Sequence, residues 1–536
     1  MTNDDDRLSR YLSSSADSIT LTPADPTGVM RRGARRRLRR RGALVGGVAV
    51  VGLLATTVVV RNTGDQKVRV SVASPQVTPS TYQWSVVKPV TGLGYSSSHT
   101  ELASGAIYGL STAPGPFNPN TPNPPATLYR SDHGTEWTKV ALPADLRVSS
   151  VASSGDTLYA LGTAPAGGGG ADLVVASSTD GAATWNPVTL PRDVADLMVR
   201  HPGQISLSQP TLAAKDATHQ VATLVVSANL DLSKYKPEVA AKNETWEWTD
   251  TGATAYQGVP PCGLPALATK EDMKTCEQQA RATVTTDANG NGPVVASYTW
   301  KDLGIDPELQ ALVHGRTYTY VTDDGAHFVR ASVDTGAVGW GSQVVADAGG
   351  YTLFLARSSK QSSTTSVLHS TDGHAWSAVA TLPGASMGAG LLAGRPAVAV
   401  SDNDGHTTVR AQQTDGSWQV LDLSQAVPAP PAGGQAYVGD VAFGPLGLAA
   451  TVTTMGKGQD QGPTPQAQYL IHSADGAHLS VLSISDKVPG TGAPVGLTVS
   501  ADAITVRLSN AVPTQGSGPA STTPPTQTVL VGTPTG

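Results

Sequence analysis

Several kinds of residue are scarce in this sequence. Of its 536 residues only two are cysteine and four are phenylalanine, and charged residues make up 15%. So few cysteines exclude a small disulfide scaffold. So few charges, together with 57 glycines and 38 prolines, argue against long surface helices. The composition therefore favours many short strands that are joined by turns.

Positive charge is concentrated at the N-terminus. Residues 1–41 contain ten arginines and five aspartates, so the remainder of the chain carries a net charge of −11. Domains that bind nucleic acid are usually basic. We therefore expect no nucleic acid among the partners of the large C-terminal region.

Residues 42–60 contain no charged side chain, and as a helix their 19 residues would span ~28 Å, close to the hydrocarbon thickness of a bilayer. Eight arginines lie between residues 31 and 41, but only Arg61, Lys67 and Arg69 follow closely. The positive-inside rule then predicts a cytoplasmic N-terminus. A cleaved signal peptide is the alternative, although it would need an unusually long basic region and has no clear cleavage site.

The expected organisation has four parts. They are a disordered, Arg-rich cytoplasmic tail (1–41), a transmembrane signal anchor in the cell membrane (42–60), a linker (61–80) and an extracytoplasmic domain (81–536). Cys262 and Cys276 both follow the span, so in an oxidising compartment a disulfide between them is predicted. No histidine lies near them in sequence, and we expect neither a metal nor a cofactor.

A short motif recurs through the large domain. Its clearest copy begins at Ser178 with Ser-Thr-Asp-Gly, ends at Trp185, and is followed by a second β-rich run. Successive copies are often 43 or 48 residues apart, which is the size of one four-stranded unit. The aspartates and tryptophans of the motif are Asp132, Trp137, Asp180, Trp185, Asp324, Asp372, Trp376, Asp415, Trp418 and Asp475.

The motif resembles the Asp-box (BNR) repeat of sialidase-like and sortilin-like β-propellers, and the repeats of photosystem II assembly factors. The copy at 178–185 matches that pattern except that Ala182 occupies a glycine position. The resemblance implies an all-β propeller of four-stranded antiparallel blades. It also implies that the Asp-box residues are structural, lying on the turn between the third and fourth strands of a blade.

Parsing the chain into such units gives eight blades, with seven as the alternative. The last unit lacks its fourth strand, whereas residues 82–88 look like a fourth strand without a blade. We therefore expect residues 82–88 to pair with residues 526–532 and to close the ring, because closure removes exposed sheet edges.

The sequence does not point to catalysis. The Arg-Ile-Pro motif that accompanies Asp boxes in sialidases is absent, and glutamate is rare. We expect a non-catalytic propeller for binding, scaffolding or sensing, with an extracellular protein or a glycan as its partner. Tyr235, Trp246 and Trp248 could anchor that partner on a face of long loops, although the tryptophans could equally be packing residues of a strand. The alternative is a sialidase-like glycoside hydrolase, active or degenerate.

Overall fold

The computed structural model is all-β. It describes residues 57–59, 69–72, 76–78, 81–90, 95–112, 126–143, 145–166, 170–237, 245–256, 294–333, 341–358, 363–402, 406–430, 434–456, 464–489, 492, 494–509 and 527–535. The described chain divides into two compact units. The smaller holds residues 203–206 and 227–315, and the larger holds the other described residues.

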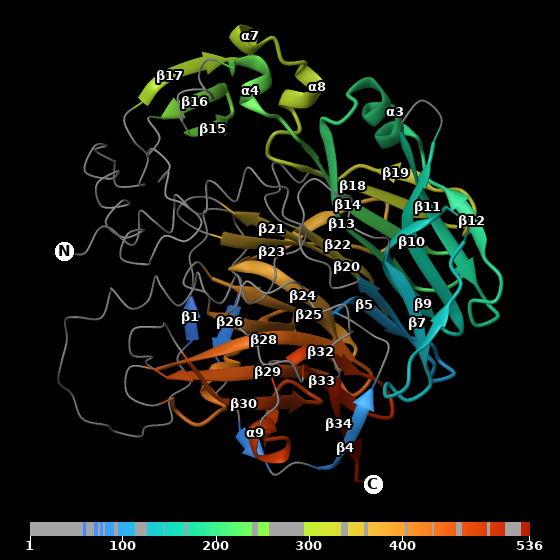
Figure 1. Cartoon of the computed structure of the whole chain (residues 1–536), viewed down its shortest axis with the longest axis vertical. Helices are drawn as coiled ribbons and strands as arrows, with labels where there is room; N and C mark the ends of the chain where they lie inside the picture. The colour runs from blue at the N-terminus through green and yellow to red at the C-terminus, as the bar shows by residue number, and fades with distance from the viewer. Residues whose placement is uncertain are drawn as a thin grey trace, which may run out of the picture. The chain divides into compact units, whose positions relative to one another are not determined.

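Seven sheets with a four-stranded antiparallel core make up the larger unit (Figure 1). The first sheet consists of β5 (Tyr95–Glu101), β6 (Ile107–Thr112), β7 (Thr127–Ser131) and β8 (Thr138–Val140). The second consists of β9 (Arg147–Ser154), β10 (Thr157–Pro165), β11 (Ala171–Ser178) and β12 (Asn186–Thr189). The third consists of β13 (Ile205–Ala214), β14 (Gln220–Ala228), β18 (Arg316–Thr322) and β19 (Val329–Ala331).

The other four sheets follow in chain order. They are β20 (Gly341–Asp347), β21 (Gly350–Ser358), β22 (Ser363–Ser370) and β23 (Ser377–Pro383); β24 (Ala385–Leu392), β25 (Arg395–Ser401), β26 (Thr407–Gln412) and β27 (Trp418–Leu421); β28 (Gln435–Gly444), β29 (Gly447–Gly456), β30 (Thr464–Ser473) and β31 (His478–Ser483); and β32 (Pro494–Val499), β33 (Ile504–Ser509), β34 (Gln527–Pro534) and β4 (Tyr82–Val90).

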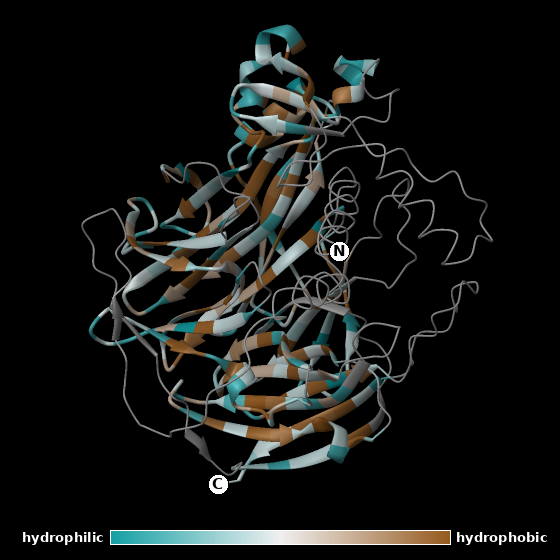
Figure 2. Cartoon of the chain, turned by 90° about the vertical axis from the view of Figure 1, so that its left-hand side faces the viewer, coloured by the Kyte–Doolittle hydropathy of each residue, from teal (hydrophilic) through white to brown (hydrophobic). Residues whose placement is uncertain are grey.

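The second strand of each sheet is the most apolar because it is covered on both faces. In β21 Leu353, Phe354 and Leu355 are all fully buried, although they point to alternate faces. Such a run is typical of a strand between two packed sheets. Figure 2 shows that apolar residues, coloured brown, lie along the strands. The turn before β21 needs a glycine, because Gly350 has a φ of +145° and a Cβ there would clash with the Ser370 carbonyl.

The first strands of the seven sheets form what we call the inner-strand ring: β5, β9, β13, β20, β24, β28 and β32. Successive members contact one another from β20 through β24, β28, β32 and β5 to β9. Hydrogen bonds link the sheet of β13 to both neighbours. The Thr223 hydroxyl donates to Ser342 Oγ at 2.9 Å, and the Ser154 hydroxyl donates to the Lys215 carbonyl at 2.8 Å. The sheets therefore follow one another around a closed circle, as in a β-propeller.

The predicted ring closure is confirmed. β4 pairs antiparallel with β34, with Trp84 opposite Gly532 and Val90 opposite Gln527. The N-terminal strand thus supplies the outer strand of the last sheet, so each chain end completes what the other leaves open.

The count of eight blades is wrong, because the described chain has seven such sheets. Residues 227–315 are an insertion between the second and third strands of one sheet, since β14 pairs directly with β18. The eighth unit of the sequence parse falls within this insertion. Its strands β15 (Thr245–Thr249) and β16 (Gly252–Tyr256) instead join β17 (Val294–Thr299) in a separate three-stranded sheet.

Short strands precede β4. β1 (Thr57–Val59) pairs with β2 (Arg69–Val72), β2 runs parallel to β27, and β3 (Gln76–Thr78) runs parallel to β31. Of the expected membrane segment, 42–60, only β1 lies among the described residues. No helix in the described part of the chain is long and apolar enough to cross a membrane.

Helices are short. In the larger unit they are α3 (Asp193–Arg200), the 3₁₀ turn η2 (Leu423–Gln425) and α9 (Ile484–Lys487). In the described part of the smaller unit they are α4 (Leu232–Tyr235), α7 (Trp300–Leu303) and α8 (Pro307–Gln310). Asp193 fixes α3 to the sheet that contains β18 and β19, because the Tyr320 hydroxyl donates to its carboxylate at 2.7 Å and Arg330 forms an ion pair with it at 3.0 Å.

Candidate functional site

The Asp-box turn that joins β11 to β12 is built around the Asp180 carboxylate. One carboxylate oxygen accepts from the Ser178 hydroxyl at 2.8 Å and from the Thr184 amide at 2.9 Å, and the other accepts from the Thr184 hydroxyl. These bonds from Thr184 and Ser178 lower the pKa of Asp180 to about 2. A carboxylate held in this way closes its own turn and exchanges no proton near neutral pH.

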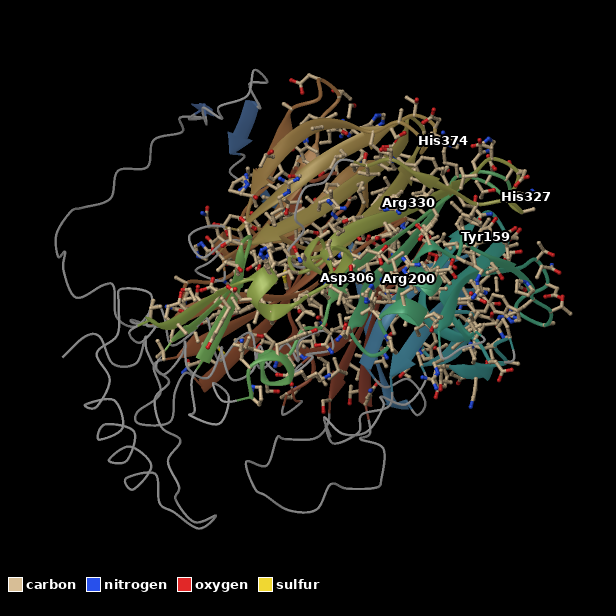
Figure 3. The ribbon with its side chains drawn as sticks, turned by 90° about the horizontal axis from the view of Figure 1, so that it is seen from above. Tyr159, Arg200, Asp306, His327, Arg330 and His374 are labelled. Atoms are coloured by element: carbon tan, nitrogen blue, oxygen red, sulfur yellow. The ribbon has the colours of Figure 1, made fainter. Side chains whose placement is uncertain are left out.

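Four other predicted Asp-box residues occupy similar turns. Asp324, Asp372, Asp415 and Asp475 each accept a backbone amide from two residues further on, at 2.8–2.9 Å. Histidines accompany some of them: His327 and His478 lie against Asp324 and Asp475. His327 and His374 project from these turns in Figure 3.

Asp132 differs from these aspartates. Its carboxylate accepts from the Arg130 side chain at 3.0 Å, and it stands one residue after its motif serine, Ser131, whereas Asp180 stands two residues after Ser178. The motif therefore predicts this turn correctly, but Asp132 lies one residue too early in it to make the hydrogen bonds that Asp180 makes.

Each tryptophan of the motif contacts either the preceding sheet or its own turn. Trp418 is only 1% exposed and meets Phe354 of the preceding sheet edge-on, with ring centroids 6.1 Å apart. Trp185 donates to the Ala141 carbonyl at the end of the preceding sheet, at 3.0 Å. Trp137 and Trp376 donate to carbonyls of their own turns, Gly134 and Gly373.

The predicted aromatic anchors all lie in the insertion. The Tyr235 hydroxyl in α4 accepts from the Gln204 side chain at 3.1 Å, and Trp248 stacks on Trp300 at a centroid distance of 5.8 Å. Trp246 lies opposite Ala255 in the sheet. Trp248 packs against the apolar core of the insertion, in agreement with the packing alternative. Cys262 and Cys276 lie outside the described residues, so their disulfide stays a prediction.

A second group of chemically useful residues lies on the inner-strand ring, where several strands are bulged. The register shifts between Ser96 and Ser98 in β5, between Ser386 and Gly388 in β24, and between Pro494 and Gly496 in β32. In β28 the shift lies between Val438 and Val441. Bulges interrupt the ladder and redirect side chains, and they are frequent beside active sites.

Three ionisable side chains gather beside these bulges, which we call the central triad: His99 on β5, Asp440 on β28 and Arg507 on β33. Their sheets are consecutive in the ring. Arg507 is 1% exposed, and its guanidinium lies across Gly496, where a Cβ would clash with it. Asp440 sits within the bulge of β28, and its amide donates to the Thr451 hydroxyl at 3.1 Å.

Arg507 interacts electrostatically with both other members of the triad. Burial, reinforced by the charge of Arg507, lowers the pKa of His99 to about 4. Burial raises the pKa of Asp440, an effect that Arg507 partly offsets. Burial lowers the pKa of Arg507 to about 10, opposed by the charge of Asp440. At neutral pH the site therefore combines a neutral imidazole, a buried cation and a carboxyl group that takes up a proton more readily than an ordinary aspartate.

Glu101, two residues beyond His99 on β5, has a different task. Both its carboxylate oxygens accept from the Ala501 amide, at 2.9 and 3.0 Å. This bond ties β5 to the turn between β32 and β33. Burial raises the pKa of Glu101 as well, but its position indicates a clamp between sheets.

Sequence reasoning missed the central triad. His99 lies 341 residues before Asp440, Arg507 lies 67 residues after it, and none of the three belongs to a repeated motif. The one local signal was a charged residue on a strand otherwise made of small and apolar residues, as in Gln435–Gly444 and Ile504–Ser509.

No protein-family model matches this chain, and no curated protein is similar to it. Among solved structures, the alpha-L-arabinanase of Penicillium chrysogenum is 10% identical, covers 83% of this chain and 98% of its own, and has a TM-score of 0.31. The sialidase of Trypanosoma rangeli is 9% identical over 74% of this chain, with a TM-score of 0.32, and only 56% of the sialidase is matched. The GH32 beta-fructofuranosidase of Bombyx mori is 11% identical, covers 83% of this chain and 91% of its own, and has a TM-score of 0.31.

These structures are glycoside hydrolases, and they contradict the expectation that the chain is not an enzyme. That expectation rested on the Asp-box turns and on a missing sialidase motif, neither of which bears on the inner-strand ring. At identities of 9–11% the likeness names no substrate and no catalytic residue for this chain.

Proposed function

We propose that the protein binds a saccharide at the inner-strand ring and hydrolyses a glycosidic bond there: Asp440 gives a proton to the leaving oxygen, and water attacks the anomeric carbon and loses a proton to solvent. The observation that carries the proposal is the central triad. Three consecutive sheets bring a carboxyl group of raised pKa, a buried guanidinium and a neutral imidazole to the bulged inner strands.

Each member of the triad has a role that its surroundings support. A general acid needs a pKa nearer the working pH than that of a free aspartate, and burial moves Asp440 in this direction. Arg507 is a fixed donor that Gly496 leaves room for, and it favours oxygen-rich ligands. His99, neutral at pH 7, can both donate to and accept from sugar hydroxyls.

The test uses the purified full chain, a glycan array and a panel of methyl glycosides, whose leaving group must be protonated. We expect binding to at least one class of glycan and slow release of methanol from a matching glycoside. Asp440→Asn should abolish release while leaving binding detectable, because the amide keeps the shape but cannot donate the proton.

Asp502→Asn is the matched control, since Asp502 lies in an exposed turn of the same sheet as Arg507. It should leave both binding and release unchanged. Failure of the wild-type chain to bind any glycan would overturn the proposal. Undiminished release by Asp440→Asn would remove Asp440 from it.

We also propose that residues 42–60 hold the protein in the cell membrane, with residues 1–41 in the cytoplasm and the propeller outside. The support is the uncharged stretch and the arginines before it. Protease added to spheroplasts should digest the propeller and spare an epitope tag at the N-terminus. Protection of the propeller would contradict this topology.

A further inference from the structure

The inner-strand ring has a second half that is almost free of charge. β13 and β24 contain no charged residue, and β20 has only Asp347, at its far end. These three strands belong to consecutive sheets. Four side chains of these strands, Gln209, Gln343, Ser386 and Met387, we call the neutral group.

Gln209 has an unusual backbone. Its φ is +48°, although it is neither glycine nor in a turn. The other described non-glycine residues with positive φ are Asp145, Ala182 and Ala393, and they lie in turns or loops. Gln209 alone among them lies within a strand, β13, and it precedes a proline. Such strain persists only where the surrounding structure enforces it, and it is concentrated at binding and active sites.

The strained backbone directs the Gln209 amide onto the next inner strand. A Cβ at Gly341, the first residue of β20, would clash with the Gln209 side-chain amide. Gly341 and Gln209 are therefore complementary: the missing side chain of one makes room for the amide of the other. Gln209 is an exposed residue, so its side chain does not belong to the hydrophobic core.

The remaining members connect this amide to the next sheet. The Ser386 hydroxyl donates to the Gln343 side-chain oxygen at 3.0 Å. Met387, at the bulge of β24, is 57% exposed, which is rare for a side chain of its hydrophobicity on an inner strand. Next to it, a Cβ on Gly388 would lie 3.7 Å from the Val441 carbonyl oxygen, directly beyond Asp440. The neutral group therefore adjoins the central triad at the two neighbouring bulges.

We infer that the neutral group is a second subsite, which holds an uncharged sugar unit next to the unit held by the central triad. Amides and hydroxyls exchange hydrogen bonds with sugar hydroxyls, and an exposed thioether packs on the apolar face of a sugar ring. This inference rests on the proposed function. It adds that the ligand is an oligosaccharide with a neutral unit at this position.

The probes are matched series of one to five units of arabino-, xylo-, galacto- and fructo-oligosaccharides, titrated calorimetrically into the full chain. We expect one series to bind at least tenfold more tightly as a dimer than as a monosaccharide. Gln209→Gly keeps the left-handed backbone but removes the amide, so it should reduce that gain several-fold and leave monosaccharide affinity unchanged. Met387→Ala should act in the same direction.

Thermal unfolding separates binding from folding. Because glycine adopts a positive φ without strain, Gln209→Gly should unfold at the same temperature as the wild type or higher. Gly341→Ala, which displaces the amide from the other side, should reduce the gain as Gln209→Gly does. Equal affinity for monomer and oligomer would overturn the second subsite while leaving the proposed function intact. So would an equal loss for both probes in Gln209→Gly. Absence of all saccharide binding would mean that the proposed function itself fails.

Discussion

The Asp-box turns and the inner-strand ring both contain aspartates, but the two regions treat them in opposite ways. Asp180 lies at the surface, and hydrogen bonds from Thr184 and Ser178 lower its pKa to about 2. Asp440 lies in a bulged inner strand, where burial raises its pKa. The first carboxylate is ionised at neutral pH and accepts hydrogen bonds within its own turn. The second is desolvated, so it takes up a proton more readily than an ordinary aspartate.

The difference shows why a repeated motif is a poor guide to chemistry in this fold. A motif that recurs in sheet after sheet must serve the sheet itself, and the Asp-box carboxylates do so by accepting amides of their own turns. A catalytic site is needed once. Its residues are brought together by the circle of sheets, and their sequence spacing carries no period.

Asp440→Asn should reduce turnover far more than the corresponding substitution in an Asp-box turn. Loss of a general acid typically costs 10²–10⁴-fold in rate, so we expect turnover of the best methyl glycoside to fall at least ~100-fold. Asp180→Asn, in an Asp-box turn, should keep wild-type turnover at 25 °C. If Asp180→Asn reduced turnover as much as Asp440→Asn, the division between structural and functional aspartates would be wrong.

Trp418→Ala should cause the largest loss of stability among the Asp-box residues. The side chain is 1% exposed and meets Phe354 edge-on, so truncation leaves a cavity between two sheets. Comparable truncations cost about 3–5 kcal/mol of unfolding free energy. Trp185→Ala should cost less, because Trp185 is only part-buried. Urea unfolding followed by circular dichroism measures both, and equal losses would refute the packing argument.

Particular residues show which features of the fold and of the site can be predicted from the sequence. The pairing of residues 82–88 with the last sheet was predictable, because one fragment lacked a strand and the other lacked a sheet. The seven-sheet count was not, because the insertion at 227–315 carries strands of its own that imitate a blade. The central triad was also unpredictable, since Arg507 meets β5 and β28 only after the circle has closed.

His99→Gln should change how stability depends on pH. The folded pKa of His99, about 4, lies below the ordinary 6.5, so the unfolded chain binds more protons between these values. Stability is therefore lost as the pH falls from about 6.5 to about 4, by up to ~3 kcal/mol. His99→Gln should remove this slope in urea titrations at fixed pH. His219→Gln, at an exposed histidine, is the control and should keep the slope. An unchanged slope in His99→Gln would contradict the burial of this imidazole.

Asp180→Asn should have a smaller effect, in a different pH window. Here the folded pKa, about 2, lies below the ordinary value of 3.8. The stabilisation from the ionised carboxylate is therefore fully present above pH 4 and is lost as the pH falls through 4 towards 2. The drop in Tm across this window should be smaller in Asp180→Asn than in the wild type, and other aspartates whose pKa is lowered, such as Asp324 and Asp475, should maintain the rest of it. Asp132→Asn is the matched control, because Asp132 bonds to the exposed Arg130 side chain instead of its turn. It should retain the wild-type drop, since the bonds of Asp180 remain. If Asp180→Asn lost as much Tm between pH 4 and 2 as the wild type, its hydrogen bonds would not hold the turn in solution. The contrast with Asp440 would then rest on burial alone.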